Sequence, residues 1–250
     1  MIVGFLGTGT IAAAMVHGIV EDNHHIWISQ RNQAISAELC KKFSAVRVAD
    51  NQIVIDRCDT IIICLLADTA RVILPTLNFH STQRILSVMV GMSVSELGTM
   101  VAPAVCEAIF IPYPSITQGN SPLLVYPKSD TLDALFGKRN EVIVVKDESA
   151  LQSYLVAQAV LSPTVKILHE TVLWLQKRVG QDVSAEKFIR LLIGGYLMAG
   201  PLDQSEVLAK ALRDLGTEGG LNAQLRDHFY ERGVYEILVD GLDELEKQLC

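Results

Sequence analysis

The sequence is short of positive charge, of paired cysteines and of long apolar runs, and each shortage excludes a class of protein. Its net charge of −7 over 250 residues argues against a general binder of nucleic acid or of anionic membranes. The five cysteines include no Cys-x-x-Cys pair, which favours buried thiols in a reducing compartment over disulfides or zinc. No apolar run is long enough to span a membrane. Since Met1 leads straight into an apolar segment, we expect a cytoplasmic protein without a signal peptide.

A glycine turn stands near the start of the sequence. The apolar run 2–6 is followed by Gly7-Thr8-Gly9-Thr10-Ile11-Ala12 and then by a helical segment. Gly7 can adopt the backbone angles of a tight turn, Gly9 lets a pyrophosphate approach the main chain, and Ala12 lets the helix pack on the strand. The free N–H groups at the start of the helix would face the phosphates. This arrangement predicts a dinucleotide site, and a purely structural turn is the alternative.

The second expected strand, residues 26–29, leads into Ser29-Gln30-Arg31-Asn32. Sites that prefer NAD usually have Asp or Glu here to hold the ribose hydroxyls. A hydroxyl followed by a guanidinium suits the 2′-phosphate of NADP, because Arg binds phosphate with a planar fork of donors. We therefore expect NADP as the cofactor. The alternative is that Arg31 is a solvated loop charge.

Strands and helices alternate over residues 1–147, which predicts an α/β domain with a Rossmann-like, doubly wound and mostly parallel sheet. The expected strands are residues 2–6, 26–29, 46–48, 61–65, 84–90, 105–111, 121–126 and 142–145. Ligands of such sheets bind at the carboxyl ends of the strands. Segments 7–12, 29–32, 65–68, 88–91 and 112–114 are expected there. The adjacent His24 and His25 would face opposite sides of a strand, so we expect no metal site.

From residue 148 no strand-like run follows, and residues 148–250 predict an all-helical domain. The expected helices are residues 149–161, 163–179, 184–199, 206–215, 221–231 and 234–248. Pro163 would lie in the first turn of the second helix, and Ser184 would be the N-cap of the third. The third helix is apolar nearly all round between Phe188 and Met198, so it must be covered on every side. A second subunit would cover it, which predicts a homodimer or a higher multiple. The alternative is that this helix is the centre of a single bundle.

Several stretches of the sequence carry a resemblance to a known family. They are Gly4 to Ala12, Ser29 to Asn32, Leu86-Ser87-Val88 with Gly91, Ile111 to Pro114, Asp147-Glu148 and Gly216 to Asn222. Together they resemble pyrroline-5-carboxylate reductase over both domains. The resemblance implies a dimeric enzyme of proline biosynthesis that passes hydride from NADPH to a small cyclic imine. The implied cofactor contacts are Gly7, Thr8, Gly9, Thr10, Ile11, Ala12, Ser29, Arg31, Asn32, Leu65, Leu66 and Pro112.

The part of the sequence that would bind substrate departs from that family. Tyr113 stands in place of an Asn, and Leu221 and Asn222 stand in place of two threonines of the family's glycine loop. The candidate substrate contacts are Tyr113, Ser162, Glu218, Gly219, Gly220 and Leu221, and the candidate catalytic residues are Asn222 and Thr217. Backbone N–H groups of residues 218–221 would hold a substrate carboxylate. Two other interpretations stay open: a related NADP-dependent reductase with a hydroxyacid or a deazaflavin coenzyme as its acceptor, and a non-catalytic dimer that senses NADP.

Overall fold

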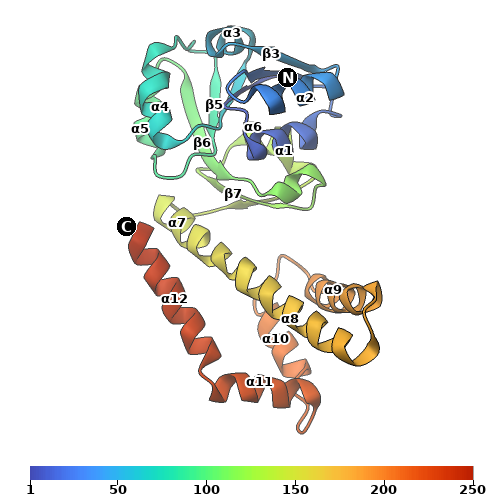
Figure 1. Ribbon diagram of the computed structural model, residues 1–250. Helices are drawn as coiled ribbons and strands as arrows, with labels where there is room; N and C mark the ends of the chain where they lie inside the picture. Colours follow the sequence, from blue (N-terminus) through green and yellow to red (C-terminus); the bar gives the residue numbers. More distant parts are fainter. Residues whose placement is uncertain (250) are drawn as a thin grey trace. The chain divides into compact units, whose positions relative to one another are not determined.

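The computed structural model describes residues 1–249 and divides the chain into two compact units, Met1–Leu151 and Gln152–Cys250. The first unit is an α/β domain, and the second consists of helices (Figure 1). The predicted fold class is therefore confirmed. None of the helices in residues 1–249 is long and apolar enough to cross a membrane.

The first unit contains one eight-stranded sheet in the order β3-β2-β1-β4-β5-β6-β7-β8 (Figure 1). Its strands are β1 (Ile2–Leu6), β2 (His25–Ser29), β3 (Val46–Ala49), β4 (Thr60–Ile63), β5 (Arg84–Ser87), β6 (Val105–Ile111), β7 (Pro122–Tyr126) and β8 (Glu141–Val144). Neighbours from β3 to β6 are parallel, β7 is antiparallel to β6, and β8 is parallel to β7. The predicted strands are confirmed, although β4 and β5 end earlier than expected. The strand order reverses between β1 and β4, which is where sheets of this kind bind ligands.

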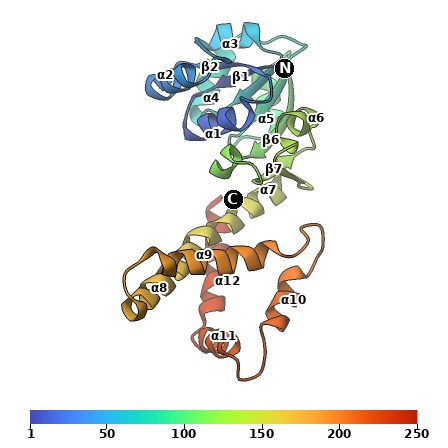
Figure 2. The ribbon, with the colours of Figure 1, turned by 90° about the vertical axis from the view of Figure 1, so that its right-hand side faces the viewer.

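Helices cover both faces of this sheet (Figures 1 and 2). One face carries α1 (Thr10–Ile19), α2 (Gln33–Lys42), the 3-10 turn η2 (Pro114–Thr117), α6 (Asp130–Leu132) and the π-helical turn η3 (Asp133–Gly137). The other carries α3 (Asn51–Arg57), α4 (Ala67–Ile73) with the 3-10 turn η1 (Leu74–Thr76), and α5 (Val94–Met100). In β4, Ile62 packs in the first core, whereas Ile61 and Ile63 pack in the second. A strand buried on both faces must be apolar at every position, which explains the continuous apolar run in the sequence.

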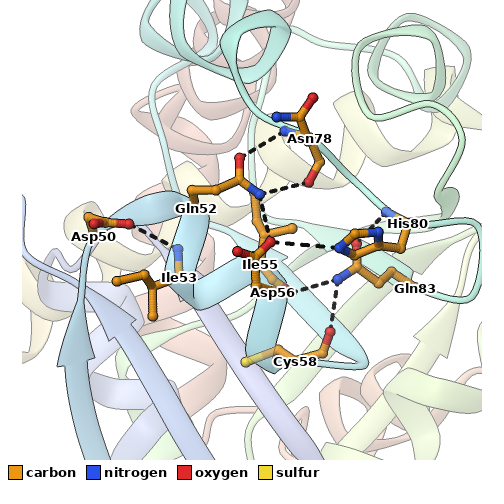
Figure 3. A network of polar contacts seen from close by, with 9 residues as sticks. All are labelled: Asp50, Gln52, Ile53, Ile55, Asp56, Cys58, Asn78, His80 and Gln83. Carbon is orange, nitrogen blue, oxygen red and sulfur yellow. Dashed lines mark hydrogen bonds and ion pairs between the residues drawn. The ribbon is translucent and has the colours of Figure 1, made fainter.

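A network of side-chain hydrogen bonds fastens α3 to the segment before β5 (Figure 3). Gln83 is buried, and its Nε2 donates to the carbonyl oxygens of Ile55 and Cys58 at 2.6 and 3.0 Å. Gln52 accepts from the N–H of Asn78 at 2.9 Å and donates to its carbonyl oxygen at 3.0 Å. Because these bonds satisfy carbonyl groups at the end of α3, they hold the last turn of that helix in place.

The second unit is helical (Figure 2). Its elements are α7 (Glu148–Ala157), which begins in the first unit, the 3-10 turn η4 (Gln158–Val160), α8 (Leu161–Val179), α9 (Val183–Met198), α10 (Val207–Asp214), α11 (Leu221–Glu231) and α12 (Val234–Leu249). Ser153 of α7 donates to Glu246 of α12 at 3.1 Å. The helices that the sequence predicts are all present.

The structure corrects two predicted helix starts. Helix α8 begins at Leu161, two residues before the predicted start, and η4 joins it directly to α7, so Pro163 lies in the first turn of α8 as expected. A proline has no N–H and crowds the carbonyl group four residues before it, here that of Ala159, which lies in the 3-10 turn. The N-cap of α9 is Asp182 rather than Ser184, and its Oδ1 accepts the Ser184 N–H at 2.6 Å. A carboxylate also interacts favourably with the positive end of the helix dipole.

Helix α9 buries only a narrow stripe within its own unit. Ile189 packs against Val172 of α8. Elsewhere on the helix, Phe188 is 55% exposed, Leu191 66% and Leu197 54%. The interpretation of α9 as the centre of a single bundle is therefore wrong for this unit, and most of its apolar surface is left without a cover inside it.

Candidate functional site

The turn between β1 and α1 requires glycine at residue 7. Gly7 has a φ of 97°, and a Cβ at this position would lie 2.4 Å from the carbonyl oxygen of Cys64. Gly9 is the N-cap of α1, and a Cβ there would have no atom within 4 Å. A side chain at Gly9 would fill open space over the helix N-terminus, and glycine leaves that space to a ligand.

Ser29 holds this turn from the neighbouring strand. Its Oγ accepts the N–H of Gly7 at 2.8 Å, and its carbonyl oxygen accepts from the Thr8 hydroxyl at 2.6 Å. Both Ser29 and Thr8 are buried. We expected the Ser29 hydroxyl to face a 2′-phosphate, but the structure commits it to the main chain of the glycine turn. The Ser29 Oγ thus helps to hold the glycine turn in place.

One cavity of about 660 Å³ opens at the carboxyl ends of β1, β2 and β4. Its lining residues are Gly7, Thr8, Gly9, Arg31, Asn32, Gln33, Cys64, Leu65 and Leu66. Most of the predicted cofactor contacts are therefore brought together here. Sequence reasoning missed Gln33 and Cys64, although each directly adjoins a predicted contact.

Four predicted contacts besides Ser29 do not line this cavity. Thr10 is the exposed first residue of α1, and Pro112 is buried after β6. Ala12 is buried in the core that α1 shares with the sheet, and Ile11 packs against that core. The small side chain expected at Ala12 thus lies at the interface between helix and strand, as the motif implies.

The charges around the cavity favour an anion. Arg31 is exposed, and its guanidinium has no hydrogen bond or ion pair with another residue of 1–249. Helix α1 has neither a side-chain cap nor an acidic residue in its first turn, so its free N–H groups keep their partial positive charge. Asn32 caps α2 through its Oδ1, which accepts the Ile35 N–H at 3.2 Å and leaves the amide NH₂ group available. Among the described residues that line the cavity there is no Asp or Glu. A phosphate-bearing ligand fits this donor set.

Two further groups lie near these strand ends and stay neutral at physiological pH. Burial raises the pKa of the Cys64 thiol well above its usual range, which excludes a thiolate in the cavity. Tyr113 follows β6, and burial raises the pKa of its phenol. Tyr113 is not among the residues that line the cavity. Its hydroxyl group is thus an intact donor outside the cavity.

The glycine loop of the helical unit lies between α10 and α11. The Gly220 N–H donates to the Thr217 carbonyl oxygen at 2.9 Å, and Gln224 Nε2 donates to the Gly219 carbonyl oxygen at 2.8 Å. The Gly220 N–H is therefore used inside the turn, and the predicted carboxylate contact is left to the other N–H groups of residues 218–221. Leu221 begins α11 and is 86% exposed.

Two other candidate substrate residues and the candidate catalytic residue Asn222 are exposed within this unit. Ser162 is near the start of α8, Glu218 is in the glycine loop, and Asn222 is in the first turn of α11. None of these three side chains hydrogen-bonds to another residue of 1–249. Each is free to contact a ligand.

Comparisons with known proteins agree with this architecture. Residues 2–91, which run from β1 to just past β5, match the family model described as NADP oxidoreductase, coenzyme F420-dependent. A search of curated protein sequences found no match.

Solved structures share the whole arrangement of elements. The 1-pyrroline-5-carboxylate reductase of Streptococcus pyogenes has a TM-score of 0.80 at 17% identity, over 100% of this chain and 98% of that one. The pyrroline carboxylate reductase of Plasmodium falciparum, with NADP bound, has a TM-score of 0.79 at 15% identity, over 99% and 96%. The chain has the pyrroline-5-carboxylate reductase fold. An imine reductase from a Pseudomonas species is less similar, with a TM-score of 0.64 at 17% identity over 98% and 87%. The pyrroline-5-carboxylate reductase fold is the one that the sequence resemblance implied.

Proposed function

We propose that the chain is an NADPH-dependent reductase that transfers hydride to the C=N bond of a small cyclic imine. The proposal depends on one observation, the cavity at the glycine turn. The N-terminus of α1 and Arg31 also lie at this cavity, and its described lining residues include no Asp or Glu. The fold supports it, since one relative has NADP bound and another is an imine reductase.

The chain's part is to bind and orient the cofactor, and NADPH supplies the hydride when bound. Gly9 and the first N–H groups of α1 would hold the pyrophosphate, and Arg31 with Asn32 would hold the 2′-phosphate. Leu65 and Leu66 would form an apolar wall that excludes water. Leu66 is 72% exposed, so its side chain is available to pack on a ligand.

We assign the acceptor side to the glycine loop of the helical unit. An imine accepts hydride well only when its nitrogen is protonated or hydrogen-bonded, and Asn222 and Thr217 supply donors in this loop. Tyr113, Ser162 and Glu218 are proposed as further substrate contacts. Leu221 has no hydrogen-bonding group where the family resemblance predicts a threonine. A site that loses such a bond discriminates steeply against the original substrate, so we expect an imine or carbonyl compound other than pyrroline-5-carboxylate to be preferred.

We propose further that the active form is a homodimer or a multiple of one. The exposed apolar surface of α9 supports this, because a second copy would remove Leu191 and its neighbours from water.

Oxidation of NADPH, followed by its absorbance with a panel of cyclic imines and 2-oxoacids, tests the proposal. We expect turnover with at least one imine and poor turnover with pyrroline-5-carboxylate. Changing Leu221→Thr and Asn222→Thr together should raise kcat/KM on pyrroline-5-carboxylate. A kcat/KM of about 10⁴ M⁻¹s⁻¹ or more for the unmodified chain would show that the altered loop does not exclude that substrate. Tight NADPH binding without turnover of any acceptor would instead indicate a non-catalytic sensor.

A second candidate function is hydride exchange between NADP and a deazaflavin coenzyme. The description of the matched family model favours it, but that match ends at residue 91 and does not reach the glycine loop. Adding coenzyme F420 to the same panel separates the two: reduction of F420 with no reduction of imines would select the second candidate.

A further inference from the structure

A second cavity lies at the amino ends of β1, β2 and β3, the opposite end of the sheet from the glycine turn. It has a volume of about 280 Å³. Its lining residues are Ile2, His25, Trp27, Ser44, Ala45, Arg47 and Arg57. Two arginines and a histidine thus line one small cavity in a chain whose net charge is −7, and the described lining residues include no carboxylate.

The polar groups of this cavity are mainly donors that lack protein acceptors. Within residues 1–249, neither the Arg57 guanidinium nor the indole N–H of Trp27 has a hydrogen-bond partner. Arg47 uses only Nη1, which donates to the carbonyl oxygens of Ser44 at 2.6 Å and Val46 at 3.0 Å. The other N–H groups of the Arg47 guanidinium have no acceptor within residues 1–249. Like charges in one cavity repel each other, and an anion between them removes that repulsion.

Both arginines are carried by well-anchored backbone. Arg57 is the last residue of α3, and Gln83 holds the carbonyl oxygens of Ile55 and Cys58 on either side of it (Figure 3). The carboxylate beside it in the sequence, Asp56, is engaged elsewhere: it accepts from Gln52 at 2.8 Å and lies 3.7 Å from His80. Arg47 is in β3, directly opposite Trp27 of β2. The main chain that carries both arginines is thus fixed, whereas their side chains are exposed and can turn toward a ligand.

We propose that this cavity binds a small anion that carries a phosphoryl group. Arg47 and Arg57 would contact the phosphoryl oxygens, because the planar fork of a guanidinium matches them, and Trp27 would form a flat wall. The volume of about 280 Å³ lies just below the roughly 300–1,000 Å³ of sites for drug-sized ligands. It therefore suits inorganic phosphate or a short phosphate ester rather than a dinucleotide. The site is separate from the cavity of the glycine turn and does not depend on the proposed reductase activity.

Tryptophan fluorescence of the full chain tests this proposal with inorganic phosphate as the probe. The chain has two tryptophans, so Trp174→Phe leaves Trp27 as the only source of tryptophan emission. We expect a saturable change in emission, half-complete at or below about 1 mM phosphate. Arg47→Gln and Arg57→Gln should each raise the half-saturation concentration at least about tenfold. Arg84→Gln is the matched control, because Arg84 is an exposed arginine of β5 that does not line the cavity.

Two controls separate this site from other sources of signal. Arg31→Ala should weaken any phosphate binding at the glycine turn, so a signal lost in Arg31→Ala but kept in Arg57→Gln would place the phosphate there and overturn the proposal. If sodium chloride at the same ionic strength changes the Trp27 emission equally, the effect is charge screening and not phosphate binding, and the proposal is overturned. Isothermal titration calorimetry compares the unmodified chain with Arg57→Gln without relying on Trp27. Identical phosphate binding by those two proteins, or none up to about 20 mM, would refute the site.

Discussion

Removing the guanidinium of Arg31 should weaken binding of NADPH but not of NADH. Arg31 lines the cavity, is exposed and has no protein partner within residues 1–249. Only NADPH carries the 2′-phosphate, so only NADPH loses a charge-assisted hydrogen bond. Such bonds contribute about 1.5–3 kcal/mol, and solvent screening at an exposed arginine favours the lower end of that range. We therefore expect Arg31→Ala to raise the Kd of NADPH by about 10- to 30-fold. The Tm should not change.

Ser29→Ala is the matched comparison, because Ser29 lies at the same strand end but is buried. The substitution removes the acceptor of the Gly7 N–H, which is bonded at 2.8 Å. An unsatisfied buried donor costs roughly 1–3 kcal/mol of stability. For a chain of this size each kcal/mol lowers the Tm by about 2–4 °C. In the proposed site the glycine turn would hold the pyrophosphate of either cofactor, so NADPH and NADH should weaken together.

Titrations of both variants with NADPH and NADH, together with thermal unfolding, distinguish these roles. Equal losses of both cofactors in Arg31→Ala would refute the assignment of the 2′-phosphate to Arg31. An unchanged Tm with selective loss of NADPH in Ser29→Ala would show that the hydroxyl contacts the 2′-phosphate after all.

Three other expectations test separate features of the chain. Gly7→Ala should lower the Tm by several degrees, whereas Gly9→Ala should leave the Tm nearly unchanged and weaken NADPH binding, because its Cβ enters the open space that the ligand would take. Light scattering at micromolar concentration should give the mass of a dimer or a higher multiple, and a monomer mass would refute the role assigned to α9. Burial, with nearby acids as a smaller cause, raises the pKa of Cys58 to about 12 and of Cys106 to about 11, so both stay protonated thiols at pH 8. Peptide mapping after a thiol reagent should therefore show the exposed Cys40 modified before either of them.

The fold could be predicted because its signals are local. A strand buried on both faces has to be apolar throughout, as residues 61–63 are. A strand, a glycine turn and the helix after it can be recognised within about a dozen residues of sequence. The ends of elements were predicted less well. The start of α9 depends on a choice between Asp182 and Ser184, which the folded main chain decides by offering the Ser184 N–H to the carboxylate. The start of α8, just before Pro163, likewise depends on how the preceding 3-10 turn accommodates the missing N–H of the proline.

The candidate site could be predicted only where backbone geometry determines it. Gly7 and Gly9 follow from the turn itself, but the bond from Gly7 to Ser29 joins residues of two strands. No pattern around Ser29 distinguishes a hydroxyl that holds a turn from one that holds a phosphate. The pair Arg47 and Arg57 was missed for the same reason, because β3 and α3 bring the two side chains to one cavity only in the folded chain.

The proposed nucleotide site depends mainly on backbone geometry, whereas the proposed acceptor site depends on side chains. The cavity at the glycine turn relies on main-chain N–H groups and on a φ of 97° at Gly7, and any sequence that keeps those glycines can rebuild it. The proposed acceptor site in the helical unit relies on exposed side chains such as Leu221 and Asn222, which nothing in the packing of α11 constrains. The proposed acceptor side can therefore change while the nucleotide side persists, in a chain that keeps the fold of solved structures at 15–17% identity. Substitution of Arg31 should then alter cofactor preference alone, and substitutions at residues 221–222 should alter acceptor preference alone.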